Sequence, residues 1–316
     1  MDRIVRAWAP ASLSNLGPGF DALGLALEGI GDMVEASWFD GPGVRVTVGL
    51  GEAVPLDPDR NTAARAAMAL LGPAGDRGIH LVIHKGIRPG SGLGSSAASA
   101  VAAAWAVARL MGGTVDKESL VGAALDGESA VSGSRHGDNV LPSLFGGIVL
   151  MTPNEPSRYR SVSAGAPMFL TVIRPDIRIL TREARAILPA FVSLADAVRN
   201  AASLAFLIDA LRCGDLETVG AMVERDLLVE PVRARLVAPY DAVRRAARDA
   251  GALGCALSGS GPAMFSLAGD AEAAERVREA MEWACRSTGV ACVSFTSTLD
   301  PQGARDARPD DPRVEA

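Results

Sequence analysis

A glycine-rich segment near residue 90 has the residue types and spacing of an anion-binding loop. Its sequence is Pro89-Gly90-Ser91-Gly92-Leu93-Gly94-Ser95-Ser96-Ala97-Ala98-Ser99, and an alanine-rich stretch follows it as far as Met111. Alternate glycines allow positive φ and bring backbone N–H groups close to a ligand. The first N–H groups of a helix lack intrahelical partners and form the positive end of its dipole. The sequence therefore predicts that segment 89–99 binds a phosphate.

Other phosphate-binding patterns are alternatives for this loop. A P-loop requires a lysine directly after its last glycine, and no lysine follows these glycines, which excludes it. Residues 92–97 do satisfy the dinucleotide pattern G-x-G-x-x-A. That pattern belongs to the first strand-to-helix turn of a Rossmann domain, with an acid at the end of the next strand, whereas a continuous helix is expected here. A glycine turn that only caps a buried helix is the remaining alternative.

The composition limits the class of protein. The chain has 316 residues, 48% hydrophobic and 22% charged, which is enough for a large core and two domains. A net charge of −6 without a basic run argues against nucleic-acid and anionic-membrane partners. Apolar stretches are shorter than the roughly 18 residues of a membrane span, and the first residues lack a leader pattern, so we expect a cytoplasmic protein. The four cysteines lack C-x-x-C spacing, which argues against a disulfide framework.

Hydrophobic patterning predicts the elements that must position the loop. In the first half we expect strands over 3–9, 33–39, 44–50 and 79–84. Capping residues and glycines predict helices over 62–71, 95–111 and 116–131. This order of strands and helices predicts an α+β fold.

A second set of elements indicates a second domain. It comprises strands over 168–174 and 291–298, a strand–turn–strand over 254–267, helices between 181 and 250, and a helix over 271–285. We place the boundary near residue 165. The tail from residue 300 is rich in Pro, Asp, Arg and Gly without apolar periodicity, so we expect it to be disordered.

Two further motifs accompany the glycine loop. Residues 9–24 contain Asn15 and the run Gly-Pro-Gly-Phe-Asp that ends at Asp21, and residues 257–265 are Leu-Ser-Gly-Ser-Gly-Pro-Ala-Met-Phe. With segment 89–99 they resemble the three motifs of the GHMP kinases, the superfamily that includes galactokinase, homoserine kinase, mevalonate kinase and phosphomevalonate kinase. Segments 134–147, 181–189 and 230–236 resemble the homoserine kinase family in particular, and the likeness extends from about Val5 to about Arg305.

The resemblance implies a two-domain GHMP kinase fold. Its N-terminal domain, residues 1–165, would resemble domain 2 of ribosomal protein S5, and its C-terminal domain, residues 166–299, would be ferredoxin-like, before the tail at 300–316. The implied activity is ATP-dependent phosphorylation of the L-homoserine hydroxyl to O-phospho-L-homoserine, in threonine biosynthesis. The implied cofactors are ATP and Mg²⁺, and a homodimer is a further implication.

The resemblance also assigns the nucleotide side of the site. Segment 89–99 would bind the phosphates, Asn61 and Thr62 would lie on the adenine side, and Ser96 and Glu128 would bind Mg²⁺. One hydroxyl and one carboxylate suit Mg²⁺, which prefers oxygen ligands and keeps several waters. Purely structural alternatives are helix capping for Asn61, Thr62 and Ser96 and a solvated helix acid for Glu128.

On the substrate side, the resemblance assigns residues to each end of a zwitterion. Arg185 and Arg233 would bind the carboxylate, for which the two-pronged guanidinium is suited. Asn15 and Asp21 would hold the ammonium, and Asn139 would face the hydroxyl. The remaining assigned residues are His136, Thr181, Gly259, Ser260 and Gly261. The alternatives are surface arginines, a loop hydrogen bond for His136, a helix cap for Thr181 and an ordinary hairpin turn over 258–261.

Asn139 decides the expected mechanism. Mevalonate kinase-like relatives have an aspartate seven residues before a Gly-Gly pair, and in this chain that position is Asn139. An amide cannot act as a general base. Asp138 is adjacent, but on an extended segment it would point elsewhere. We therefore expect positioning and Mg²⁺-assisted charge stabilisation without a strong side-chain base, the proton passing to the phosphate or solvent.

Two rival functions are compatible with the sequence. A GHMP kinase that acts on another small alcohol would be favoured if Arg185 and Arg233 were far from the pocket. A catalytically silent relative that senses a nucleotide or metabolite would be expected if Ser96 or Glu128 were missing, but both are present.

Overall fold

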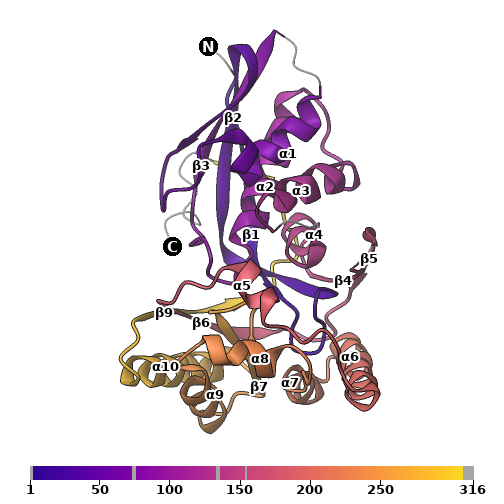
Figure 1. The fold of residues 1–316 in the computed structure, drawn as a ribbon, viewed down its shortest axis with the longest axis vertical. Helices are drawn as coiled ribbons and strands as arrows, with labels where there is room; N and C mark the ends of the chain where they lie inside the picture. The colour runs from indigo at the N-terminus through magenta and orange to yellow at the C-terminus, as the bar shows by residue number, and fades with distance from the viewer. Residues whose placement is uncertain (1–2, 73–75, 133–135, 154, 309–316) are drawn as a thin grey trace.

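Two β-sheets organise the chain, one in each half (Figure 1). The computed structural model describes residues 3–308 except 73–75, 133–135 and 154. Within these residues the first sheet has the order β10-β1-β2-β4-β5, with β3 paired to β2, and the second has the order β7-β8-β6-β9. The predicted α+β fold class is therefore confirmed.

The first sheet is built around one long strand. Its members are β1 (Val5–Ser14), β2 (Leu23–Val48), β3 (Arg77–His84), β4 (Ile148–Thr152), β5 (Glu155–Val162) and β10 (Arg305–Asp306). The expectation of two separate strands at 33–39 and 44–50 is wrong, because β2 runs through both regions. Its register shifts at Gly41, where φ is 118°, so that its two halves pair with opposite edges of β3. Glycine permits this reversal because it tolerates positive φ.

Four helices cover one face of the first sheet (Figure 1). They are α1 (Thr62–Leu71), preceded by a short 3₁₀ turn (Pro58–Arg60), α2 (Ser95–Leu110), α3 (Lys117–Ser132) and α4 (Gly137–Phe145). The alanines of α2 other than Ala108 are fully buried, and the small side chains allow α1, α3 and α4 to approach it closely. Since α2 lies between these helices and the sheet, its N-terminus is rigidly positioned.

The second domain follows a ferredoxin-like order. Its strands are β6 (Phe169–Pro175), β7 (Gly254–Leu257), β8 (Met264–Ala268) and β9 (Cys292–Thr298). Its helices are α5 (Thr181–Ala186), α6 (Leu194–Cys213), α7 (Leu216–Val223), α8 (Glu230–Arg233), α9 (Tyr240–Asp249) and α10 (Ala271–Ser287). In Figure 1, α5 lies on the side of this domain that faces the first domain. The residue-165 boundary falls between β5 and β6.

The predicted disorder of the tail is wrong for residues 300–308. Arg305 and Asp306 form β10, which pairs with β1. Asp300 is 1% exposed and accepts hydrogen bonds from the Arg305 guanidinium and from two backbone N–H groups. Asp306 accepts hydrogen bonds from Trp105 and Arg109 of α2. Paired charges hold this segment, so its sequence needs no apolar periodicity; residues 309–316 lie outside the described residues.

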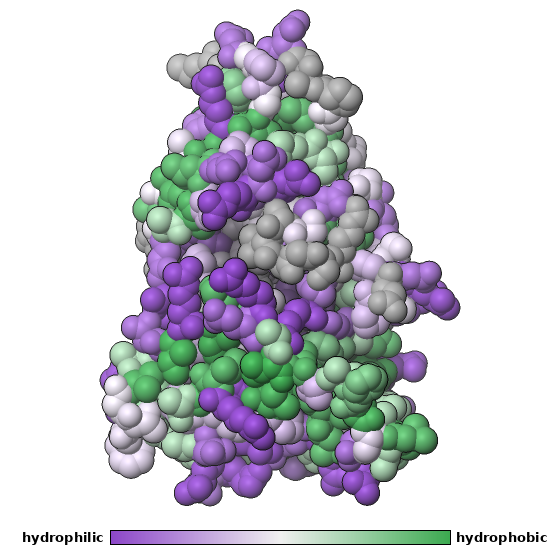
Figure 2. Space-filling model, in the orientation of Figure 1, coloured by the Kyte–Doolittle hydropathy of each residue, from purple (hydrophilic) through white to green (hydrophobic). Residues whose placement is uncertain are grey.

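The surface of the second domain is partly apolar. Phe191 and, on α6, Leu194, Val198 and Phe206 are 93%, 80%, 59% and 63% exposed. In Figure 2 hydrophobic surface gathers over the lower half of the molecule, whereas hydrophilic residues cross its middle. Within the described part of the chain, none of the helices has the length and apolarity to cross a bilayer.

Candidate active site

The three motifs, far apart in sequence, meet at the junction of the two domains. The N–H of Ser12 donates to Leu93 O at 3.1 Å, and Ser258 Oγ donates to Gly92 O at 2.6 Å. The third side is closed by Gly259 N, which donates to Ser14 O at 3.1 Å. The glycine loop is thus joined by hydrogen bonds to both of the other motifs.

The glycine loop has the geometry of an anion cradle. Gly90, Gly92 and Gly94 have φ of 73°, 82° and 68°, and Gly94 is the N-cap of α2 without a side-chain cap. A Cβ on Gly92 would lie 2.7 Å from Ser258 O, and one on Gly94 would collide with the Ser12 hydroxyl. Glycine is therefore required for the close approach, and the first N–H groups of α2 are left for a ligand.

A buried ion pair beneath the loop ties it to the sheet. Lys85 and Asp32 form this pair, and their side chains are 2% and 0% exposed. Lys85 Nζ also donates to Ser95 Oγ and Ser99 Oγ, at 2.6 and 3.0 Å. Asp32 accepts from the N–H groups of Gly86 and Ile87 at 3.2 and 3.1 Å. The side chains of Ser95 and Ser99, predicted phosphate contacts, thus take part in this network.

The predicted magnesium ligands lie side by side at the start of α2. The Ser96 hydroxyl hydrogen-bonds the Glu128 carboxylate, and burial raises the pKa of Glu128 to about 7 despite this bond. Thr62 Oγ1 donates to Ser96 O at 3.1 Å, which joins α1 to the same point. Over the described residues no group of three or more acidic, histidine or cysteine side chains could hold a metal. A hydroxyl and a single carboxylate nevertheless fit Mg²⁺, which is often held by few protein ligands together with phosphates and waters.

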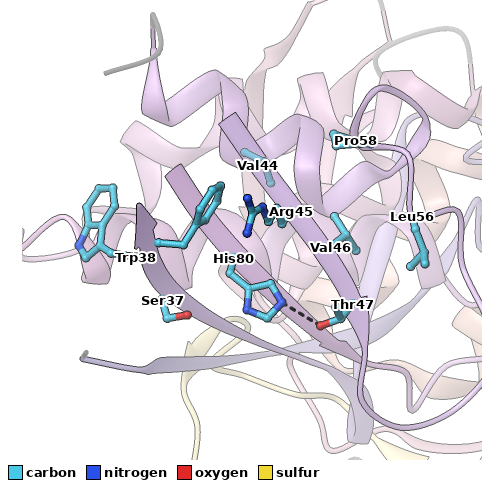
Figure 3. Close-up of a pocket in the computed structure, with 10 residues that line it drawn as sticks. Ser37, Trp38, Val44, Arg45, Val46, Thr47, Leu56, Pro58 and His80 are labelled. Atoms are coloured by element: carbon cyan, nitrogen blue, oxygen red, sulfur yellow. Dashed lines mark hydrogen bonds between the residues drawn. The ribbon is translucent and has the colours of Figure 1, made fainter. Parts of the chain in front are cut away.

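Asn61 has the capping role that was an alternative for it. Its Oδ1 accepts from Ala64 N at 3.0 Å, and its Nδ2 donates to Pro55 O at 2.7 Å. A hollow of about 470 Å³ lies nearby, between the paired strands β2 and β3 and the segment before α1 (Figure 3). Its lining includes Leu56 and Pro58 but none of the predicted substrate residues. An adenine contact for Asn61 and Thr62 stays a prediction.

The predicted charged substrate residues form one cluster. Arg185 on α5 donates to both carboxylate oxygens of Asp21, at 3.0 and 2.7 Å, and its Nη2 lies 3.3 Å from His136 Nδ1. Arg233 on α8 is 3% exposed and donates to Ala184 O and Gly259 O. Both guanidiniums lie over the Phe20 ring, 5.4 and 5.0 Å from its centroid. The surface alternative for the two arginines is therefore wrong.

Backbone conformation fixes the loop that carries Asp21. Asn15, Leu16 and Asp21 have positive φ of 72°, 50° and 55°, a backbone conformation that is unfavourable for residues other than glycine. Asn15 stabilises this shape because its Oδ1 accepts from Asp21 N and its Nδ2 donates to Gly259 O, both at 3.2 Å. Asn15 thus positions Asp21. Thr181 begins α5 and is exposed, and Leu180 is the N-cap, so the capping alternative for Thr181 is wrong.

The segment around Asn139 differs from the prediction. Asp138 and Asn139 lie in the first turn of α4, so the expected extended segment is wrong. Asn139 Oδ1 accepts from Ser12 Oγ at 2.9 Å, and its Nδ2 donates to Ser14 Oγ at 3.2 Å. The Ser14 hydroxyl also hydrogen-bonds Asp138, whose pKa burial and the nearby Asp21 charge raise to about 6. Asp138 and Asn139 therefore share Ser14, and Asp138 does not point elsewhere.

The electrostatics of the cluster follow from its burial. Burial and the neighbouring Arg185 charge lower the pKa of Arg233 to about 10. The same two causes lower the pKa of His136, which favours the neutral form of its imidazole. Two guanidiniums thus face Asp21 and Asp138. Phe20, Ser12, Ser14 and the Lys85–Asp32 pair were not predicted from the sequence, although Phe20 directly precedes Asp21 in the first motif.

The site combines a glycine cradle at a helix N-terminus with a neighbouring cluster of charged side chains. On this two-domain fold, that combination defines a small-molecule kinase of the GHMP class. The family model described as "GHMP kinases N terminal domain" matches residues 61–147, and "GHMP kinases C terminal" matches residues 207–286. The structure of Leishmania major mevalonate kinase in complex with R-mevalonate has a TM-score of 0.77 at 17% identity, over 95% of this chain and 97% of that one, which shows a shared fold.

Closer relatives identify the branch of that class. The homoserine kinase of Pyrococcus furiosus is 43% identical over 287 residues, 90% of this chain and 94% of the relative. That of Halobacterium salinarum is 39% identical over 98% of this chain and 99% of the relative. The crystal structure of homoserine kinase from Cytophaga hutchinsonii has a TM-score of 0.90 at 36% identity, over 96% and 97% of the two chains. The chain belongs to the homoserine kinase family and is an ATP-dependent small-molecule kinase.

Proposed function

We propose that this enzyme transfers the γ-phosphoryl group of ATP to the side-chain hydroxyl of L-homoserine, giving O-phospho-L-homoserine for threonine synthesis. The observation that carries the proposal is the cluster of Asp21, Arg185 and Arg233 beside the glycine loop. An α-amino acid needs a cationic site for its carboxylate and an anionic site for its ammonium, and this cluster offers both. The names of the relatives support the same substrate.

The donors of the glycine loop would bind the nucleotide phosphates. The N–H groups at the start of α2 supply positive potential at that point, and Gly92 and Gly94 allow close approach. Ser96 and Glu128 would hold Mg²⁺ with phosphate oxygens and waters as the remaining ligands. When bound, the ion would neutralise negative charge on the phosphates.

Asn139 would orient the substrate hydroxyl. Its amide is fixed by Ser12 and Ser14, yet Oδ1 keeps a lone pair and Nδ2 keeps a second hydrogen for the substrate. Asn139 also borders Gly94, so it lies between the phosphate cradle and the charged cluster. Because an amide cannot accept a proton, we propose catalysis by positioning and charge stabilisation, with the proton leaving to the phosphate or solvent.

A substrate panel tests the function. Purified protein with Mg-ATP is assayed for ADP release with homoserine, threonine, serine, mevalonate and galactose. We expect the highest kcat/KM with homoserine. Turnover of mevalonate without turnover of homoserine would refute the substrate and leave the fold unaffected. Nucleotide binding without turnover of any alcohol would favour a sensor.

We also propose that the enzyme is cytoplasmic and forms a homodimer. The support for a dimer is the exposed apolar surface of α6, in which Leu194 and Phe206 are 80% and 63% exposed. Light scattering measures the solution mass. Leu194→Glu should shift a dimer toward monomer, and a monomeric wild type would contradict the proposal.

A further inference from the structure

The substrate cluster neutralises itself before any ligand arrives. Arg185 donates both terminal nitrogens to the two carboxylate oxygens of Asp21, the geometry that an amino-acid carboxylate would adopt on the same guanidinium. The two side chains are 29% and 15% exposed, so solvent competes weakly with the pair. The Asp21 carboxylate therefore occupies the place proposed for the carboxylate of the substrate.

From this geometry we infer that the Asp21–Arg185 pair is an internal gate that selects zwitterions. The inference rests on the proposed function of the site. A ligand that brings only a carboxylate takes Arg185 and leaves Asp21 without its bidentate ion-pair partner. A ligand that brings only an ammonium leaves Arg185 without an anion. Only a ligand with both charges replaces each half of the broken pair.

The surroundings make an unreplaced half costly. Asp21 is held in a positive-φ conformation by Asn15, and its side chain is only 15% exposed, so its carboxylate has little access to solvent. The Phe20 ring lies under both guanidiniums and excludes water from that side. A charge left unpaired in such a place costs more than one at an exposed site. The pair therefore resists ligands that satisfy one end alone.

The charge balance of the cluster has the same consequence. Above pH 7, Arg185 and Arg233 carry two positive charges, and Asp21 and Asp138 carry two negative charges. His136 is neutral there because burial and Arg185 lower its pKa. A zwitterion leaves this sum at zero, whereas a monovalent ligand changes it by one in a poorly solvated place. Arg185 Nε is buried and has no acceptor in the described part of the chain, so a substrate carboxylate also meets an unsatisfied donor.

The test uses two truncated alcohols as probes. 4-Hydroxybutyrate has the carboxylate and hydroxyl of homoserine without its ammonium, and 3-amino-1-propanol has the ammonium without the carboxylate. Calorimetry at pH 8 gives their affinities for the wild-type enzyme in the presence of a non-hydrolysable ATP analogue. We expect both to bind at least about 100-fold more weakly than homoserine.

Asp21→Asn should change the two carboxylate ligands in opposite directions. Homoserine should bind about 100-fold more weakly, because its ammonium loses its partner. 4-Hydroxybutyrate should bind about tenfold more tightly than to the wild type, because Arg185 no longer has to leave Asp21. The reciprocal Arg185→Gln should improve 3-amino-1-propanol by a similar factor. Arg182→Ala, an exposed arginine of the same helix, is the matched control and should leave all three affinities unchanged.

The outcomes separate the gate from the function. Weaker or unchanged 4-hydroxybutyrate binding in Asp21→Asn, with the melting temperature and nucleotide affinity retained, would overturn the gate. If that variant does not fold, Arg185→Gln decides by the same criterion with 3-amino-1-propanol. Wild-type turnover of homoserine is measured independently, so its absence refutes the proposed function, whereas the direction of the affinity change in the variants tests the gate.

Discussion

The buried Lys85–Asp32 pair gives a stability prediction that can be worked from its contacts. Lys85→Met removes the cation and leaves the Asp32 carboxylate, whose side chain is 0% exposed, with two backbone donors and the Ser99 hydroxyl. Removing one partner of a buried pair costs about 3–5 kcal/mol. Because three donors still contact Asp32, we expect the lower end, about 3 kcal/mol of unfolding free energy.

The double variant makes the prediction specific. Asp32→Asn alone leaves the Lys85 ammonium buried, so we expect a similar loss of about 3 kcal/mol. In Asp32→Asn/Lys85→Met no charge is buried, and the total loss should be only about 1–2 kcal/mol, far below the sum of the single losses. Lys117→Met removes the other lysine of the chain, which is partly exposed, and should cost less than about 1 kcal/mol.

Urea denaturation followed by circular dichroism measures these free energies. The Lys85 and Asp32 variants should raise the KM for ATP more than they change kcat, because the pair fixes Ser95 and the loop backbone at Ile87. Additive losses in the double variant would refute the reasoning. An unchanged KM for ATP in a folded Lys85→Met enzyme would show that the loop does not depend on the pair.

Three further predictions concern catalysis, pH and the C-terminal segment. Asn139→Ala should lower kcat by about 10–100-fold with little change in the KM for ATP. If Asp138→Asn lost activity by several orders of magnitude while it still folded and bound homoserine, Asp138 would be the general base instead. Burial raises the pKa of Glu230 to about 7, so protonation of Glu230 favours the folded state, and this contribution to stability is lost as pH rises from about 4.5 to 7. Between pH 5 and 8 the wild type should lose up to about 3 kcal/mol of unfolding free energy relative to Glu230→Gln, as measured by melting curves. Parallel pH dependence of the two proteins would contradict this. Truncation after Leu299 should strongly lower solubility and melting temperature, because it removes β10. Asp306→Ala keeps the β10 pairing and should cost only about 1 kcal/mol of unfolding free energy. Equal effects of the two changes would place the stabilisation in the Asp306 side chain.

Local signals predicted much of the fold. The bounds of α1 follow from Asn61, which caps it, and from Gly72, which ends it, and both act within a few residues. Helix α4 was missed because it begins with Gly137 and contains Pro142, both poor helix formers. It forms because Leu141 and Leu144 are fully buried in the core and Ser143 donates to Pro10 O. That stabilisation is tertiary, so the sequence of the segment does not contain it.

The site could be predicted as a set of residues but not as a network. Glycines and the motif order identified the three converging loops, since their function requires special backbone angles. The contact between Arg185 and Asp21 spans 164 positions, and that between Lys85 and Asp32 spans 53. No local pattern encodes such pairs, because they depend on how β2, the glycine loop and α5 come together in space. Ser14 was missed for the same reason.

The pairing of β10 with β1 has a consequence for biosynthesis. β1 leaves the ribosome before the second domain is made, whereas Arg305 and Asp306 follow that domain, at about 5–20 residues per second. Until they emerge, the outer edge of β1 has unpaired backbone groups that could template another strand. Completion of the first domain must therefore wait until the second domain has been synthesised, so a nascent chain stalled in the second domain would be exposed to misassembly and to chaperone capture.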